Sequence, residues 1–245
     1  MFYNLLPGFF ASLPRFGLAA ASGVIKDMIA SRISNIYSGW NIDVRVDQPT
    51  DVTASGVTTV EVGGPDPNGL GLFGYDNSPG KDVGNLRLGD TVGGANAETL
   101  MDGSPGYGGV FIDGFLFFSE SQPPSSGSGP EPDPLFDEIF SGVRASPATL
   151  AEVRGEGPRA AEVERAVRAL ASMVGETTAH ELGHSFGLAN PFGSANSFHN
   201  RSDQPGCLMD SGSARPFGER TDQPGFEDTH LCGDHVEYLD TILGR

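Results

Sequence analysis

The stretch Thr178-Ala-His-Glu-Leu-Gly-His-Ser-Phe-Gly-Leu-Ala-Asn190 places two histidines four residues apart. On a helix, residues at this spacing lie one above the other on one face, so His180 and His184 can direct two imidazole nitrogens at one zinc ion. Glu181 follows His180 directly and can accept a proton from a water that the metal activates. The stretch therefore predicts a zinc site at the end of a helix, with Glu181 as general base.

The residues before this stretch continue the same helix. From about residue 159, apolar residues recur at helical spacing, and the same face extends to Glu181 and His184. The apolar positions on that face are Val163, Val167, Leu170 and Val174. A buried helix holds ligands rigidly, so we expect the site on the inward side of the helix.

The residues after the histidines carry a resemblance to a known group of enzymes. Gly187 follows His184 by three residues and is expected to end the helix, because glycine adopts a left-handed conformation at low cost. The sequence resembles the metzincin clan of zinc endopeptidases, whose motif is HExxHxxGxx followed by His or Asp, with a methionine turn further on. The matching residues are His180, Glu181, His184, Gly187 and, for the turn, Met209 within Cys207-Leu-Met-Asp210.

The resemblance covers about residues 18–245 and implies a fold. Metzincins are α+β proteins with a twisted, mostly parallel sheet and two long helices in an upper lobe. A small irregular lower lobe, here about residues 188–245, ends in a C-terminal helix. Residues 1–17 are interpreted as an N-terminal extension or precursor remnant, because their apolar run is broken by Pro7 and Pro14 and lacks the basic residues of a signal peptide.

The third zinc ligand is the point at which the chain departs from the family motif. Asn190 occupies that position, and a neutral amide is a weak zinc ligand. We favour His199, at the end of a loop that follows, over Asn190 or Asp203. His230 and His235 lie beyond the methionine turn and are less favoured.

Met209 and the two cysteines are expected to be structural. In the metzincin interpretation Met209 packs beneath the metal, and an ordinary core methionine is the alternative. A bridge between Cys207 and Cys232 would close a loop of about 26 residues, stabilise the fold by about 3 kcal/mol and imply export. Two free buried thiols are the alternative.

Two further hypotheses concern residues outside the motif. The gluzincins, another zinc clan, take a glutamate ligand from a downstream helix, but Glu219 and Glu227 lie among Gly, Pro and Asp residues that disfavour one. Tyr238 is a weakly supported candidate for assisting polarisation of a substrate carbonyl.

Glycine and proline number 35 and 18 of 245 residues, so short elements and long loops are expected elsewhere. Ser22, Ser146 and Asp234 are predicted to cap helices, and Gly39 to stop the first of them. Residues 119–134 are low in complexity and predict a flexible insertion. The predicted elements are helices at 22–38, from 146 and at 234–243, and strands at 40–47, 58–62, 86–88 and 109–118.

The formal charge of −17 repels phosphates, so nucleic acid is an unlikely partner. No apolar run approaches the roughly 20 residues that span a bilayer. Asp76, Asp82 and Asp90 could bind calcium, although ordinary turn chemistry is the favoured interpretation.

Taken together, these features predict a secreted or extracytoplasmic zinc endopeptidase that acts as a monomer on protein or peptide substrates. Two alternatives come from other classes of protein. The first is a catalytically inactive binding module with the same fold. The second is a calcium-binding extracellular structural domain in which the histidine motif is incidental.

Overall fold

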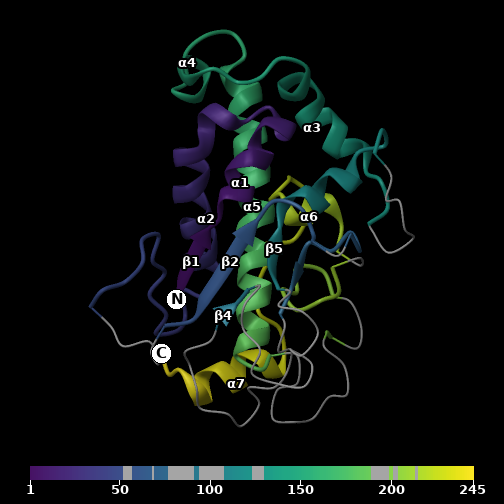
Figure 1. Cartoon of the computed structure of the whole chain (residues 1–245). Helices are drawn as coiled ribbons and strands as arrows, with labels where there is room; N and C mark the ends of the chain where they lie inside the picture. The colour runs from purple at the N-terminus through teal and green to yellow at the C-terminus, as the bar shows by residue number, and fades with distance from the viewer. Residues whose placement is uncertain are drawn as a thin grey trace.

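The computed structural model shows a mostly parallel open sheet combined with several helices (Figure 1). The long helix α5 (Ala160–Ser185) runs through the middle of the molecule. Helix α2 (Ser22–Ile36) lies beside it, and both helices cover the same face of the sheet. The structure describes residues 1–51, 57–67, 69–76, 91–93, 108–122, 130–188, 199–200, 204–212 and 215–245.

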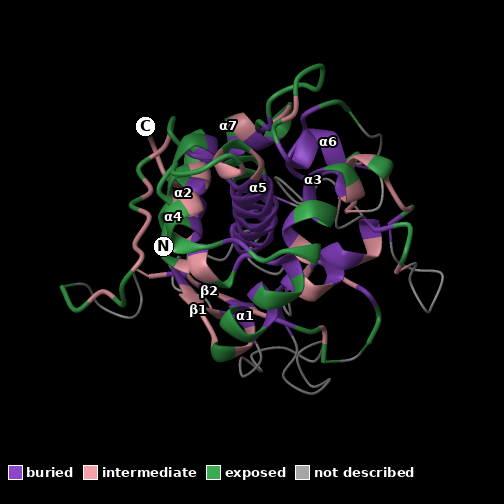
Figure 2. Cartoon of the chain, turned by 90° about the horizontal axis from the view of Figure 1, so that it is seen from above, coloured by how far each residue is buried: buried purple, intermediate pink, exposed green. Residues whose placement is uncertain are grey.

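Helix α5 is buried along most of its length. Every residue from Ala169 to Ser185 is buried, and Figure 2 shows the helix at the centre of the molecule, surrounded by the other elements. A helix buried on all sides is normally apolar all round. The buried part of α5 nevertheless contains Glu176, His180, Glu181 and His184, so its polar side chains need specific partners.

The sheet has the order β1-β2-β5-β3, and β4 also pairs with β2. All pairs are parallel except β3 with β5, which is antiparallel and leaves β3 at an edge. The prediction of a mostly parallel sheet is therefore confirmed, as is the strand at 58–62. The strands are β1 (Phe2–Leu5), β2 (Thr59–Gly63), β3 (Gly74–Tyr75), β4 (Thr91–Val92) and β5 (Gly109–Phe111).

The two predicted long helices and the C-terminal helix are also present, and α7 crosses near the end of α5 that carries the histidines (Figure 1). None of the helices in the described ranges is long and apolar enough to cross a membrane. The remaining α-helices are α1 (Pro7–Ser12), α3 (Pro134–Ala145), α4 (Leu150–Val153), α6 (Phe217–Arg220) and α7 (Asp234–Ile242). Short 3-10 helices cover Leu13–Phe16, Ala19–Ala21 and Ile112–Phe118.

Residues 1–17 belong to the folded unit, which corrects their interpretation as an extension. Strand β1 is an edge of the sheet, paired with β2. Phe9, Leu13 and Phe16 are fully buried or nearly so. Pro7 and Pro14 do not interrupt the segment, because each lies in the first turn of a helix, where a missing N–H costs little.

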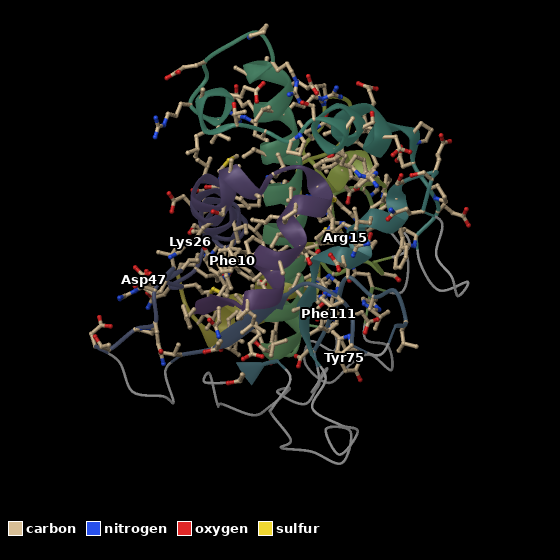
Figure 3. All side chains as sticks on the ribbon, turned by 45° about the horizontal axis from the view of Figure 1, so that its top comes forward. Phe10, Arg15, Lys26, Asp47, Tyr75 and Phe111 are labelled. Carbon is tan, nitrogen blue, oxygen red and sulfur yellow. A yellow bond between two sulfur atoms is a disulfide. The ribbon has the colours of Figure 1, made fainter. Side chains whose placement is uncertain are left out.

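The predicted strand at 40–47 is absent, and the predicted strand at 109–118 is only partly present. Residues 40–47 make only an isolated bridge, Phe2 to Arg45, although an ion pair of 3.1 Å between Lys26 and Asp47 holds this segment beside α2 (Figure 3). The run 109–118 is a strand only to Phe111 and then becomes a 3-10 helix that buries Phe115 and Phe118 in the core. The predicted strand 86–88 lies outside the described residues.

The helix ends also differ from the predictions. Ser22 and Asp234 are first helical residues and not N-caps, and α2 ends at Ile36 with Tyr37 as its C-cap, before Gly39. Thr149, not Ser146, caps α4, because it forms a capping box with Glu152.

Helix α3 was not predicted from the sequence at all. It begins inside the predicted insertion 119–134, where Asp133 accepts a hydrogen bond of 2.9 Å from the backbone N–H of Leu135. Residues 123–129 of that insertion lie outside the described residues.

Two neighbouring phenylalanines test whether the N-terminal segment is part of the core. Phe9 is fully buried, whereas Phe10 is 46% exposed and is labelled on the outside of α1 in Figure 3. We expect Phe9→Ala to lower the free energy of unfolding by about 3–5 kcal/mol and Phe10→Ala by less than about 1 kcal/mol, as measured by chemical denaturation. Equal, small effects would show that residues 1–17 are dispensable.

Candidate metal centre

Three histidines predicted as ligands lie together at the end of α5. The ring centroids of His180 and His184 are 4.6 Å apart, and those of His199 lie 5.3 and 5.4 Å from them. The candidate ligand atoms of the three residues all lie within 4.8 Å of one another. The cluster is thus of a size that one metal ion can join. The alternatives for the third ligand, Asn190 and Asp203, lie outside the described residues.

A backbone carbonyl orients the first of these rings. Nδ1 of His180 lies 2.7 Å from the carbonyl oxygen of Leu208. The tautomer that this contact requires carries the proton on Nδ1, which leaves Nε2 as the atom for a metal. Such outer contacts are typical of metal-ligating histidines, because they hold both the ring and its tautomer.

The turn that supplies this carbonyl packs directly under the helix. Met209 is fully buried, and a Cβ atom placed on Gly183 would lie 2.6 Å from its sulfur atom. The missing side chain at Gly183, between the two helical histidines, thus leaves the space that the Met209 side chain occupies. Met209 therefore packs against α5 at the position between the two helical histidines.

A glycine turn and a disulfide set the path of the chain after α5. Gly187 has a φ of 85°, and the N–H of Leu188 donates to the carbonyl of Gly183 at 3.0 Å, so α5 ends in the left-handed turn that the sequence predicts. Cys207 and Cys232 form a disulfide with their Cα atoms 5.7 Å apart. The disulfide ties the methionine turn to the segment before α7.

Glu181 is buried beside the histidines. The backbone N–H of Asp76 donates to its carboxylate, whereas Oε2 has no hydrogen-bond partner in the described part of the chain. A Cβ atom at Gly74 would lie 2.3 Å from Oε1, so a glycine is needed where the edge strand meets this carboxylate. Burial, and then the charge of Asp76, raise the pKa of Glu181 well above its usual value.

The two helical histidines are held in their neutral form. Burial and the neighbouring histidines lower the pKa of His180 well below its ordinary value and that of His184 to about 3. A neutral imidazole keeps the lone pair that metal binding requires. The neutral form of His180 and His184 is therefore compatible with a role as metal ligands.

The histidines and Glu181 line a cavity of about 320 Å³. Residues 71–76, which include the edge strand β3, form one wall, and Tyr75 of this strand is labelled in Figure 3. The residues after the methionine turn, together with Arg220 of α6, form another.

A buried network of charges holds α5 one turn before His180. Glu176 is completely buried and forms ion pairs with Arg32 of α2 and, at 2.7 Å, with Arg215. Its Oε1 also accepts a hydrogen bond of 2.7 Å from Thr229. Arg215 binds Glu219 at 2.6 Å, and Glu219 in turn accepts a bond of 2.9 Å from the backbone N–H of Gly206, next to the disulfide.

This network corrects one expectation from the sequence. Glu219 does lie in a helix, the short α6, although Gly and Pro residues surround it. Its carboxylate is occupied by Arg215 and the N–H of Gly206, and it does not line the cavity of the histidines. Glu219 therefore does not act as the glutamate ligand of a gluzincin-like site.

The other candidates from the sequence are not part of the histidine cluster, although His235 is near enough to His184 to lower its pKa and Asp76 lines the same cavity. Glu227 is exposed, and Tyr238, buried in α7, does not line the cavity. His230 is close to Cys207 and Cys232, but both sulfur atoms of that group are used in the disulfide. Buried His235 contacts the backbone of Leu188. Asp76 lies beside Glu181, and Asp82 and Asp90 fall outside the described residues.

Glu176, Thr177, Arg215 and Arg220 are site residues that the sequence did not reveal. Each surrounds or lines the site only because segments distant in the sequence meet at α5.

Comparison with family models, curated proteins and solved structures finds no significant match to this chain.

Removing the proposed third ligand tests the metal centre. We expect His199→Ala to weaken zinc binding by about 100-fold or more. Removing a residue that only supports a metal ligand already costs about 10-fold to 100-fold, and removing the ligand itself should cost at least as much. Zinc affinity would be measured by competition with a chromophoric chelator. His230→Ala, in an exposed histidine, is the matched control and should bind zinc normally. Unchanged zinc affinity in His199→Ala would show that His199 is not the third ligand.

Proposed function

We propose that this chain is a zinc-dependent endopeptidase of metzincin type. The observation that carries the proposal is the position of Glu181, a buried carboxyl group that shares one cavity with three clustered histidines. Two of those histidines are neutral at physiological pH for reasons of burial. This combination of a proton acceptor and a three-nitrogen ligand set is typical of hydrolytic zinc sites.

The donor set fits zinc better than the other common metals. Three imidazole nitrogens suit zinc, whereas calcium and magnesium prefer oxygen ligands. Three protein ligands also leave a position open for water or substrate, as in catalytic sites. A zinc ion bound there would act as a Lewis acid toward water and the substrate carbonyl.

Glu181 would move the proton in the reaction. Its carboxylate is held by the N–H of Asp76, and its Oε2 is available to accept a proton from the attacking water. The same carboxyl group can then donate that proton to the amine that leaves. No covalent intermediate with the protein is needed, because water is the nucleophile.

The edge strand β3 favours a peptide as the substrate. Within the described part of the chain β3 pairs only with β5, and its residues line the cavity beside Glu181. An extended peptide can add to an edge strand of a sheet through backbone hydrogen bonds, which hold the chain without selecting its sequence. The edge would thus bring a scissile bond alongside the histidines.

The disulfide fits an extracellular location, since such bonds persist in oxidising compartments. We therefore propose that the protein is secreted. We also propose that it acts as a monomer on protein or peptide substrates.

A conservative change at Glu181 tests the proposed activity. We expect Glu181→Gln to lower the rate of hydrolysis of casein or gelatin by about 100-fold to 10,000-fold, because the amide cannot accept the proton, while stoichiometric zinc is retained. Glu164→Gln changes an exposed carboxylate at the other end of α5 and serves as the control with normal activity. Stoichiometric zinc without any Glu181-dependent hydrolysis would indicate a binding module instead.

A further inference from the structure

Arg220 is a buried cation in the wall of the proposed active-site cavity. Its side chain is 3% exposed, and it lines the cavity together with His180 and Glu181. Nε donates to the carbonyl of Arg215 at 3.3 Å and Nη2 to the carbonyl of Gly212 at 2.6 Å. The guanidinium lies over the ring of Phe73, with 5.2 Å between Cζ and the ring centroid. These contacts hold the group in place without neutralising it.

Arg220 has no direct carboxylate partner among the described residues, although the charges of Glu176 and Glu219 act on it from the neighbouring network. In the neighbouring network, Glu176 and Glu219 pair with Arg215, and Glu176 also pairs with Arg32. Within the described ranges, no carboxylate forms an ion pair with Arg220. Burial and the nearby Arg215 lower the pKa of Arg220 to about 9, which still leaves it charged at neutral pH. Buried charges are rare without a partner, so this cation has capacity for an anion.

A second unused group lines the same cavity. Thr177, three residues before His180 on α5, is 4% exposed, and its Oγ1 has no hydrogen-bond partner among the residues that the structure describes. Buried hydroxyl groups are normally bonded, and an exception in a cavity wall indicates a missing partner. A ligand in this cavity could therefore accept hydrogen bonds from the hydroxyl and from the guanidinium, which line the same cavity.

We propose that Arg220 and Thr177 form a subsite for a carboxylate of the peptide substrate, next to the scissile bond. A carboxylate carries one charge and matches a single guanidinium, with which it forms strong, directional hydrogen bonds. A phosphate would bring a larger negative charge into a cavity that also contains Glu181 and Asp76. The proposal rests on the proposed function, since it names the substrate class of the same site.

The carboxylate can come from two sources. One is an Asp or Glu side chain beside the scissile bond, and the other is the C-terminal carboxylate of a short substrate. Peptides blocked as N-acetyl and C-amide derivatives, with Glu or isosteric Gln scanned through the positions that flank the cleavage site, test the first source. The Gln peptides with a free C-terminus test the second.

The decisive measurement is the ratio of kcat/KM values for the carboxylate peptide and its amide counterpart, with the zinc-loaded protein. We expect a ratio of about 30 or more, as a buried, hydrogen-bonded charge pair implies. Arg220→Met should bring the ratio to near one, and Arg220→Lys should restore part of it. Arg168→Gln, on the exposed side of α5, is the control and should leave the ratio unchanged.

Thr177→Val covers the case in which Arg220→Met does not fold. This variant removes a hydroxyl group that makes no hydrogen bond within the described ranges, so it should fold normally and lower the ratio several-fold through the lost hydrogen bond to the substrate. A wild-type ratio near one for both carboxylate sources would overturn the proposal, as would a high ratio that persists in folded Arg220→Met.

Binding to the Glu181→Gln protein separates this proposal from the proposed activity. The affinities of fluorescent carboxylate and amide peptides for that variant, measured by anisotropy, require no turnover. Preferential binding of the carboxylate peptide, without hydrolysis by the wild type, would support the subsite and refute the peptidase. Hydrolysis by the wild type with equal affinities and equal rates for both peptides would do the reverse.

Discussion

The structure depends on satisfying the polar side chains of a helix that is buried on all sides. Glu176 is the clearest case, because its carboxylate has no access to solvent and is held by Arg32, Arg215 and Thr229. Removing one partner from such a buried pair typically costs about 3–5 kcal/mol, since a charge is left without compensation. This requirement brings α2, the segment around α6 and the chain before α7 to one point on α5.

The candidate site is a consequence of this arrangement. One turn beyond Glu176, His180 donates a hydrogen bond to the carbonyl of Leu208 in the methionine turn. The disulfide and Glu219 hold that turn in place. Gly74, which has no side chain, allows the edge strand β3 to lie close to the carboxylate of Glu181. Helix α5 thus places His180, Glu181 and His184 on one rigid element, which is the arrangement that the proposed metal chemistry would need.

Sequence reasoning recovered those features that depend on local spacing. The periodicity of Ile25, Ile29 and Ile33 was enough for α2, and the motif was enough for α5 and its end at Gly187. It failed for residues 1–17, where two prolines were interpreted as breaks although they begin helices. Arg220 and Thr177 could not be recognised, because their meaning lies in a cavity formed by segments that meet only in the folded chain.

Zinc-edge X-ray absorption of the zinc-loaded protein tests the central claim most directly, because it counts imidazole and sulfur ligands around the metal. We expect three imidazole nitrogens, from His180, His184 and His199, one further light atom, and no sulfur. Sulfur in the first coordination shell would place the metal at Cys207 and Cys232 and contradict the assignment. A protein that does not bind zinc at all would contradict it as well.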